Sequence, residues 1–370
     1  MSNRRMDDAN VSVVSTPADF AQMLPEMKEL ADRVSALPIT LRPEWWSIAI
    51  RLHNLDDLFV IAVRTCDGRL VGVAPFYRTK ARLFGIYTVR VLRPIGDRSN
   101  SFEYSGWIID DEFIIAYRLV VELLRREKKS YDLIWLPKSK DKYLQPICQE
   151  IRRALLPFRR RERVFSAVPL PDSLEDFERR FSPKSRNRLR RNTKRVLQAT
   201  NAKLVRCNNE ADLNEFLEAL FHLHQRRWES VGRSGAFERN PVEREFYKEF
   251  SKVALHEGWL DIYALKMSST FVAVQFGYTV NGVFYQFQEG YEPSLGQGTG
   301  NALRHLVFKD LIRRGIDCYD FMEGWSEHKR MWRAKKEIGR DVIVGSPRIQ
   351  SRLLIYIPIW PSGRFFTWLA

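Results

Sequence analysis

One order of secondary-structure signals occurs twice along the chain, and this repeat constrains the fold more than any other feature. In each half, an amphipathic helix precedes three strand-like stretches, a second helix and a short apolar strand. Three strands joined by short turns form an antiparallel meander, and a helix can then return the chain to the same sheet. The order repeats although the residues do not, so we expect two copies of one α/β unit.

The first copy shows its hairpin most clearly at Asp67-Gly68, a dipeptide that favours a tight turn between strands. Apolar residues recur at helical spacing before the meander and again after it. The sequence predicts helices over 17–34 and 111–129, and strands over 58–65, 69–77, 87–95 and 131–137.

The second copy contains Asn281-Gly282, another strong hairpin signal. Its predicted helices span 210–232 and 301–315, and its strands span 259–267, 271–280, 283–291 and 316–324. We therefore expect an N-terminal domain over 1–165, a second domain over 166–347 and an apolar C-terminal tail over 348–370.

The charge of the chain points to an anionic partner. A formal net charge of +15 suits nucleic acid, an acidic membrane surface or a phosphorylated ligand. The four cysteines lie far apart without a CxxC pair, which argues against a zinc site and a disulfide framework and favours a reducing cytoplasm. The first ten residues lead into no apolar stretch, and no run of about 18 apolar residues occurs. We expect neither a signal peptide nor a transmembrane helix.

A glycine-rich stretch lies between the last meander strand and the helix of the second copy. Gly296, Gly298 and Gly300 allow tight turns, and the unpaired N–H groups of the following helix add to an anion cradle suited to a pyrophosphate. A nucleotide triphosphatase loop would need Lys and Ser/Thr after its last glycine, and a dinucleotide fold would need a parallel strand before it. The alternative is that the glycines only form a tight loop.

The meander, glycine-rich turn, helix and strand resemble the core of the GNAT acyltransferases. Three stretches, 185–196, 223–232 and 319–334, are similar to recurrent motifs of the cellulose-biosynthesis (CelD/BcsL-like) acetyltransferase family, which is related to the Fem-type transferases. The family commonly has Tyr-Lys where this chain has His328-Lys329. This resemblance implies two tandem GNAT-like domains, each with a mixed, mostly antiparallel sheet flanked by helices, of which the N-terminal one is degenerate.

The resemblance also implies a co-substrate, acetyl-CoA or another acyl-CoA, and no metal. The residues expected to hold it belong to the glycine-rich loop and the start of its helix: Gln297, Gly298, Thr299, Gly300 and Asn301.

The stretch 182–196 carries seven lysines and arginines and no acidic residue. Ser182 and Pro183 form a good helix start. Solvated helix faces usually mix both charge signs, so this one indicates a surface for phosphates or an acidic glycan, with Arg188, Arg190 and Arg191 as candidate contacts. It lacks interleaved aromatics and a helix-turn-helix partner, so nucleic acid is not expected, except tRNA in a Fem-type alternative.

Acyl transfer to an amine or hydroxyl needs a base, oxyanion donors and an acid for the leaving thiolate. The resemblance implies backbone N–H groups of strand 283–291 as the donors. Candidate bases near the ends of the core strands are Glu323, His328, Glu289 and Asp320. The structural alternative for Glu323 is a capping or surface carboxylate, and that for His328 is a polar helix residue. Candidate acceptor-site residues are His224, Arg227, Trp228, Lys329 and Trp332.

Three functions remain open at this point. The first is an acyl-CoA-dependent N- or O-acyltransferase, acting on a glycan or amine acceptor of cell-envelope or exopolysaccharide (cellulose-type) biosynthesis. The others are a Fem-type aminoacyl-tRNA-dependent transferase and a non-catalytic scaffold of a polysaccharide synthase. The tail, with Trp360, Phe365, Phe366 and Trp368, packs on a domain or lies at the inner face of the membrane.

Overall fold

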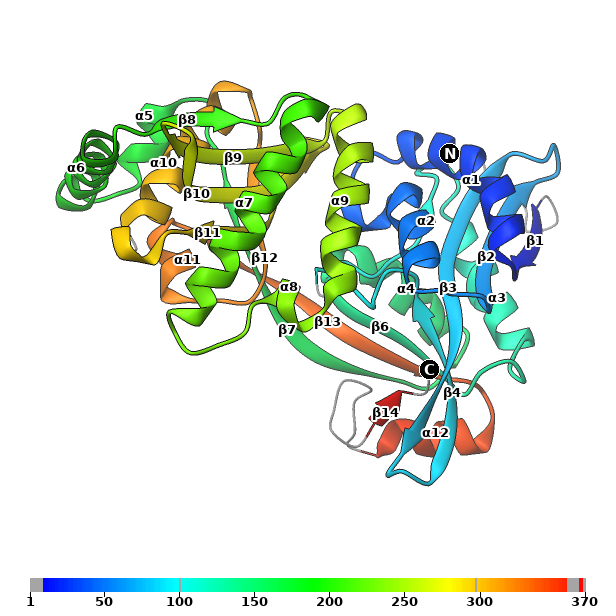
Figure 1. Cartoon of the computed structure of the whole chain (residues 1–370). Helices are drawn as coiled ribbons and strands as arrows, with labels where there is room; N and C mark the ends of the chain where they lie inside the picture. The colour runs from blue at the N-terminus through cyan, green and yellow to red at the C-terminus, as the bar shows by residue number, and fades with distance from the viewer. Residues whose placement is uncertain (1–8, 100, 297, 358–365, 369–370) are drawn as a thin grey trace. The chain divides into compact units, whose positions relative to one another are not determined.

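The computed structural model describes residues 9–99, 101–296, 298–357 and 366–368. The chain divides into two compact units (Figure 1). Unit 1 comprises the described residues up to Val164 and from Ile338 onward, and unit 2 spans Phe165–Glu337. Strands β7 (Phe158–Pro169) and β13 (Lys335–Gly345) carry the chain between them.

The sheet of unit 1 is antiparallel except for one pair. Its strands follow the order β1-β2-β3-β4-β6-β13, and only β4 and β6 run parallel. Two short strands, β5 (Ile108–Ile109) and β14 (Phe366–Trp368), pair with β3. The main strands are β1 (Ala9–Val14), β2 (Leu58–Thr65), β3 (Leu70–Leu83), β4 (Tyr87–Pro94) and β6 (Leu133–Lys140).

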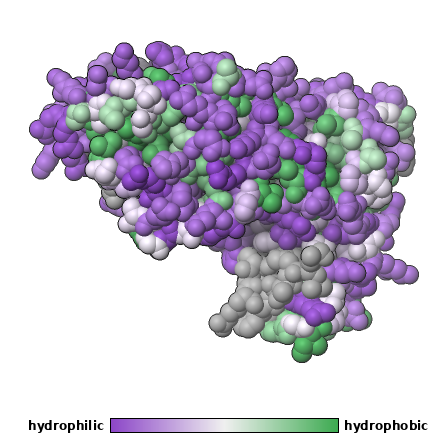
Figure 2. Space-filling model, viewed as in Figure 1, coloured by the Kyte–Doolittle hydropathy of each residue, from purple (hydrophilic) through white to green (hydrophobic). Residues whose placement is uncertain are grey.

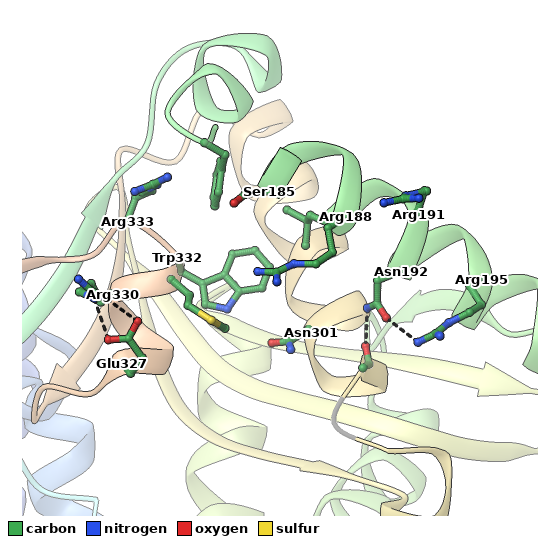
Figure 3. Close-up of a pocket in the computed structure, with 14 residues that line it drawn as sticks. Ser185, Arg188, Arg191, Asn192, Arg195, Asn301, Glu327, Arg330, Trp332 and Arg333 are labelled. Atoms are coloured by element: carbon green, nitrogen blue, oxygen red, sulfur yellow. Dashed lines mark hydrogen bonds and ion pairs between the residues drawn. The ribbon is translucent and has the colours of Figure 1, made fainter. Parts of the chain in front are cut away.

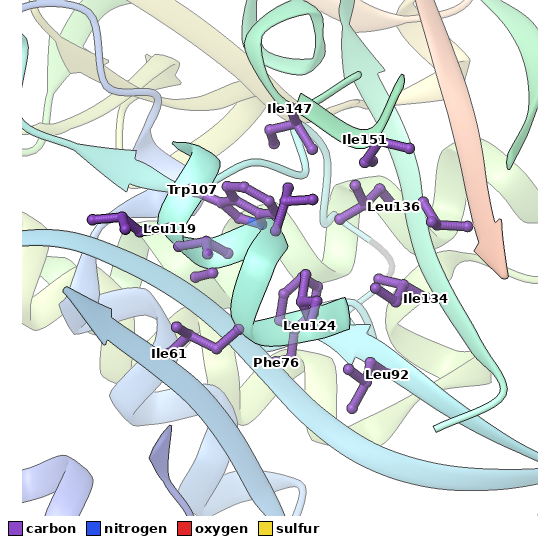
Figure 4. Packing of buried hydrophobic residues seen from close by; sticks show 14 of the residues in the cluster. Ile61, Phe76, Leu92, Trp107, Leu119, Leu124, Ile134, Leu136, Ile147 and Ile151 are labelled. Carbon is purple, nitrogen blue, oxygen red and sulfur yellow. The ribbon is translucent and has the colours of Figure 1, made fainter. Parts of the chain in front are cut away.

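Helices of unit 1 bury apolar faces against this sheet. In the core shown in Figure 4, Leu124 and Ile147, from two helices, pack with Ile61, Phe76 and Ile134 from three strands. Removing these side chains from water is the main favourable term for the unit. The helical elements are α1 (Pro17–Arg33), η2 (Ile39–Leu41), α2 (Pro43–Leu52), α3 (Ala116–Arg126), α4 (Asp141–Arg153) and α12 (Ile349–Tyr356).

The sheet of unit 2 has the same kind of pairing. The order is β8-β9-β10-β11-β12-β7, and β11 and β12 form its parallel pair. A hairpin at Asn281-Gly282 joins β10 and β11, as the sequence predicts. The strands are β8 (Lys203–Arg206), β9 (Leu260–Met267), β10 (Thr270–Val280), β11 (Val283–Tyr291) and β12 (Cys318–Glu323).

Helices cover both faces of the unit 2 sheet. Aromatic contacts join α7 and α9 to β10 on one face, whereas α5, α6 and α10 share a core with β9–β12 on the other. The helical elements are α5 (Leu174–Arg179), α6 (Pro183–Thr200), α7 (Glu210–Glu229), α8 (Ala236–Arg239), α9 (Pro241–His256), η3 (Pro293–Leu295), α10 (Gly298–Arg313) and α11 (Glu327–Met331).

The predicted fold class is confirmed: each unit has a mixed, mostly antiparallel sheet flanked by helices in the repeated order. One predicted helix, 111–129, begins only at Ala116, because Asp110 holds a turn by accepting a hydrogen bond from the Glu112 N–H. Residues 338–347, assigned to the second domain from the sequence, pack in unit 1.

Residues 349–356 of the predicted tail form α12, whereas Trp360 and Phe365 lie outside the described residues. No helix in the described part of the chain is long and apolar enough to cross a membrane.

Candidate active site

In unit 2, the parallel strands β11 and β12 separate part-way along their length. Their ladder pairs 283–285 with 318–320 and does not continue into the rest of β11. On its other side, β11 shifts register against β10: Gly277 pairs with Gln286 but Phe276 pairs with Gln288, so Phe287 is an extra residue. A β-bulge of this kind leaves backbone groups outside the ladder. Beyond residue 285, β11 therefore lies outside the ladder with β12.

Helix α10 begins seven residues after β11 ends. Gly296 has φ +77°, a left-handed conformation that favours glycine, and turns the chain into the helix. The first-turn N–H groups of a helix lack carbonyl partners within it and carry its positive dipole end. Gln297, one of the predicted cofactor contacts, lies outside the described residues.

A pocket of about 890 Å³ opens at this helix start, and its lining is strongly basic. Helices α6, α10 and α11 supply most of its wall, and Figure 3 shows Arg188 reaching from α6 toward the side where Trp332 lies. Its polar and glycine lining consists of Ser185, Arg188, Arg191, Asn192, Arg195, Gly298, Asn301, Glu327, Arg330 and Arg333. Phe181, Leu189, Met331 and Trp332 provide the apolar part.

Close packing explains two of the glycines. The Asn192 amide donates to the Gly298 carbonyl at 2.9 Å, and a Cβ on Gly298 would lie 2.8 Å from Asn192 Oδ1. A Cβ on Gly300 would lie 3.1 Å from the Tyr291 ring. Thr299 is buried, and its hydroxyl lies 3.3 Å from the Leu295 carbonyl oxygen, so it faces away from the pocket.

Trp332 offers an unused hydrogen-bond donor in this pocket. Its side chain is only 3% exposed, and Nε1 has no partner among the described residues. A buried indole N–H usually finds a partner, since leaving it unpaired costs about 1–3 kcal/mol. A ligand atom in the pocket could accept this hydrogen bond.

The cations of α6 divide into two groups. Arg188 and Arg191 line the pocket and make no hydrogen bond or ion pair with any described residue. Arg190 instead forms an ion pair with the buried carboxylate of Glu178, which fixes α6 to α5. Arg190 does not line the pocket.

A buried arginine that the sequence analysis did not select, Arg304, bridges the separated strands. It is 2% exposed and donates to Glu289 on β11 and, at 3.4 Å, to the Tyr319 hydroxyl on β12. Arg227 also donates to Glu289, at 3.0 Å. The Glu289 carboxylate thus neutralises two guanidinium groups, which argues for a structural role over that of a base.

Arg304 also contacts the imidazole ring of His328. Its Nη1 lies 2.7 Å from His328 Nε2, and because a guanidinium only donates, Nε2 accepts. Burial, followed by the charges of Arg304 and Arg227, lowers the pKa of His328 to about 3. The imidazole is a weak base here, which argues against His328 as the general base. The side chain of Asn301, which lines the pocket, lies 3.3 Å from the same nitrogen, so this network adjoins the pocket.

The end of β12 holds the other acidic candidates. Asp320 is buried and accepts from the Met322 N–H at 2.8 Å, which supports the positive φ of Met322. Glu323 is half-buried at the last position of the strand. The Lys329 ammonium donates to the carbonyls of residues 321, 323 and 324, at 2.7–3.1 Å, and so holds this strand end.

The predicted pair on α7 belongs to an aromatic cluster. Trp228 Nε1 donates to His224 Nε2 at 3.0 Å, and His224 packs edge-on against Phe237. Burial lowers the pKa of His224 to about 4, so its ring is neutral. Neither residue lines the pocket, whereas Arg227 reaches Glu289 on β11.

The geometry agrees with the comparison to protein families. Residues 183–330 match the Acetyltransferase (GNAT) domain. This segment is similar to a GNAT acetyltransferase domain. It contains α6, the bulged strand β11, the start of α10 and most of α11. The protein is therefore an acyltransferase.

Solved structures of similar fold cover both units of the chain. FemX aligns with a TM-score of 0.60 at 10% identity, covering 90% of this chain and 96% of its own. The C-terminal domain of a candidate lysylphosphatidylglycerol synthetase from Agrobacterium fabrum aligns with a TM-score of 0.55 at 11% identity, covering 90% and 95%. L-PGS from Bacillus licheniformis has a TM-score of 0.51 at 14% identity, covering 85% and 96%. At these identities the likeness shows the fold. No curated protein matches the sequence significantly.

In unit 1, the described part of the segment between β4 and α3 differs from its counterpart in unit 2. Its helix α3 starts 22 residues after β4 ends, counting from Pro94 to Ala116. Part of the intervening segment bonds to the end of β6: the Tyr104 N–H donates to the Lys138 carbonyl at 2.6 Å, and Ser139 Oγ donates to the Ser105 carbonyl at 2.6 Å. This segment lies beside β6 just beyond the two residue pairs that join β4 to β6.

Several residues that line the unit 2 pocket were not predicted from the sequence. Asn192, Arg195, Arg330 and Arg333 line it, and each lay in or beside a motif already selected. The sequence does contain a pattern that indicates a buried position for Arg304. Gly300, Arg304 and Phe308 lie at i, i+4 and i+8, on one face of the helix. A cation on the apolar face of a helix requires a buried partner, and that partner is Glu289.

Proposed function

We propose that the protein is an acyl-CoA-dependent N- or O-acyltransferase that uses acetyl-CoA. The observation that carries this proposal is the pocket at the start of α10, where five arginines and a free indole N–H surround the first turn of a helix. CoA combines phosphates with an amide-rich arm, which these groups suit. Gly298, Gly300 and Asn301 would hold it together with Arg188 and Arg191.

The chain supplies the groups that acyl transfer needs. Bound acyl-CoA provides a thioester carbonyl. Backbone N–H groups of β11, beyond its ladder with β12, are the proposed donors to the carbonyl oxygen. Glu323, half-buried at the last position of β12, is the proposed base. It would accept the proton of the attacking amine or hydroxyl as the new C–N or C–O bond forms. The thioester C–S bond then breaks, and CoA leaves as a thiolate that takes up a proton from solvent.

For the acceptor, we propose an anionic glycan or amine of cell-envelope or exopolysaccharide (cellulose-type) biosynthesis. The cations of α6 outside the pocket support this, since Lys184, Arg186 and Lys194 pair with no described carboxylate. We place the enzyme in the cytoplasm, at the inner face of the membrane or beside a polysaccharide synthase. His224, Trp228, Lys329 and Trp332 shape the site around this acceptor or the donor.

A second candidate is aminoacyl transfer from tRNA. The likeness to FemX across 90% of the chain favours it, and the unpaired cations of α6 suit a nucleic-acid backbone. Under this proposal the basic pocket would hold the end of a tRNA.

Thermal unfolding with each ligand separates the two candidates. Acetyl-CoA should raise the melting temperature, because a ligand that binds only the folded state stabilises it, and bulk tRNA should not. Arg188→Ala/Arg191→Ala should weaken acetyl-CoA binding about tenfold or more, as expected for two lost phosphate contacts.

The matched control is Lys184→Ala/Arg186→Ala, which removes the same charge from the same helix outside the pocket. If both double variants lost the same affinity for acetyl-CoA, the effect would come from net charge alone, and the pocket would not be the acetyl-CoA site. Stabilisation by tRNA alone would replace the first candidate with the second.

A further inference from the structure

Two neighbouring elements of unit 1 expose large apolar side chains. At the end of the β3–β4 hairpin, Ile86 is 87% exposed and Tyr87 is 44% exposed. On α12, Ile349, Leu353 and Tyr356 are 79%, 64% and 75% exposed. The three α12 residues are spaced i, i+4 and i+7, so they form one stripe along a helix face.

The hairpin and α12 belong to one packed cluster. Ala81, Leu83 and Val89 of the hairpin share a buried core with Ile355 of α12. Because these inward residues are in contact, the outward residues form a single surface, which we call the apolar edge (Ile86, Tyr87, Ile349, Leu353 and Tyr356). Figure 2 shows hydrophobic side chains where Figure 1 places the end of the hairpin.

The charge around the apolar edge has one sign. No aspartate or glutamate occurs in 78–92 or in 346–357. Arg90 and Arg348 neutralise the buried Asp132, whereas Lys80, Arg82 and Arg352 are exposed and form no ion pair with a described residue. Arg82 and Lys80 lie one and three residues before the end of β3 at Leu83, roughly 3 and 10 Å along the strand. Long cationic side chains reach over such distances to headgroups.

We infer that the apolar edge and its three cations bind the surface of an anionic lipid bilayer. Aliphatic side chains at a protruding hairpin and helix can enter the headgroup region, and tyrosines favour that boundary. Lysine and arginine beside them attract acidic lipids. No described helix is able to span a membrane, and α12, with eight residues, lies on the surface instead.

A second copy of the chain is the competing occupant. If two copies met at their apolar edges, six cations would lie close together. Neither 78–92 nor 346–357 contains a carboxylate that could neutralise them. Acidic headgroups neutralise these charges, so the bilayer fits better. This inference rests on the proposed function, because it names the surface that brings the enzyme to a membrane-bound acceptor. The experiment that tests it measures lipid binding and uses no acyl donor.

Sedimentation with lipid vesicles tests the inference. The full chain should bind vesicles that contain about 30% phosphatidylglycerol, bind pure phosphatidylcholine at least tenfold more weakly, and be released by high salt. Failure to bind the anionic vesicles would overturn the inference. Loss of acetyl-CoA binding in a separate assay would leave it standing, so the two proposals fail independently.

Paired variants locate the binding surface. Ile86→Ser/Leu353→Ser should weaken binding about tenfold, and Lys80→Ala/Arg82→Ala/Arg352→Ala should weaken it by about fivefold for each cation. All five positions are exposed, so the fold should be unchanged by circular dichroism. The control Ile114→Ser/Leu155→Ser removes two other exposed apolar residues of unit 1, 72% and 81% exposed, and should bind as the wild type does.

Two outcomes would contradict this assignment. If the Ile86/Leu353 variant and the Ile114/Leu155 control bind equally, another surface holds the lipid. If the chain is a dimer in the absence of lipid and the Ile86/Leu353 variant is a monomer by analytical ultracentrifugation, the apolar edge is an interface between copies.

Discussion

The buried Arg304 holds three polar side chains of unit 2 in hydrogen bonds or ion pairs. The guanidinium donates to Glu289, His328 and Tyr319, and so occupies three groups that could otherwise exchange protons. Burial raises the pKa of the Tyr319 hydroxyl and lowers that of His328. Glu323, on the neighbouring strand end, is the carboxylate that we assign to proton transfer.

Glu323→Gln should lower kcat about 10²–10⁴-fold, because a general base contributes this much, and should leave KM for acetyl-CoA nearly unchanged. Glutamine keeps the size of the side chain and its place at the end of β12. Steady-state kinetics with the purified acceptor measure both constants.

His328→Ala provides the comparison. If the rate of the wild type rises near pH 6.5, the same rise should occur in this variant, because the pKa of His328 in the folded protein is about 3. A larger kcat loss in His328→Ala than in Glu323→Gln, together with a changed pH profile in that range, would reassign the base to His328.

At the scale of elements, the start of α10 depends on close contacts with β11 and α6. The Gly300 position faces the Tyr291 ring, and the Gly298 carbonyl is bound by Asn192 of α6. A displaced helix start would move the first-turn N–H groups and the pocket wall together.

Gly300→Val should weaken acetyl-CoA binding at least tenfold, because its branched side chain would displace Tyr291 or the helix start. Gly300→Ala is the graded control: its Cβ, 3.1 Å from the ring, requires a shift of a few tenths of an ångström, so affinity should be kept. Isothermal titration measures both variants. Wild-type affinity in Gly300→Val would remove this turn of α10 from the binding site.

Local signals explain which elements could be predicted. The turns at Asp67-Gly68 and Asn281-Gly282 determine their hairpins through backbone conformation alone, and both form as expected. Strands β7 and β13 were not predicted, because arginines and lysines interrupt their apolar alternation. Arg161 and Arg163 of β7 form ion pairs with the buried Asp341, about 180 residues away. Such long-range pairs leave no local pattern.

The candidate site was predictable only in part for the same reason. The glycine-rich loop and the basic helix are contiguous motifs, and the structure brings Arg188, Arg191 and Gly298 to one pocket. Within the same helix, Arg190 turns toward Glu178, a partner that sequence spacing could not reveal. The separation of β11 from β12 depends on sheet pairing and likewise has no local signal.

At the scale of the whole molecule, two buried histidines (His224 and His305) and two half-buried ones (His53 and His328) predict sensitivity to acid. Burial lowers the pKa of His53, His224 and His305 to about 4, and that of His328 to about 3. Unfolded histidine titrates near 6.5, so below that pH the unfolded chain binds more protons than the folded chain. Stability should therefore be complete above about pH 6.5 and fall as the pH drops toward 4.

Urea unfolding between about pH 7 and pH 5 should show a loss on the order of 1–2 kcal/mol for each histidine. His305→Gln should reduce the dependence of stability on pH, because it removes one of these titrating groups. A free energy of unfolding that is constant over this range would contradict the burial of these rings.

The discontinuity of unit 1 has a consequence for synthesis on the ribosome. Strand β6 pairs with β13, whose residues emerge about 200 positions later. A nascent chain ending before residue 338 thus presents β6 as an open sheet edge, which is prone to pairing with other chains. Unit 2 is contiguous and can fold first. Translation pauses or nonsense mutations after unit 2 should therefore yield chains that recruit chaperones through an unfinished first unit.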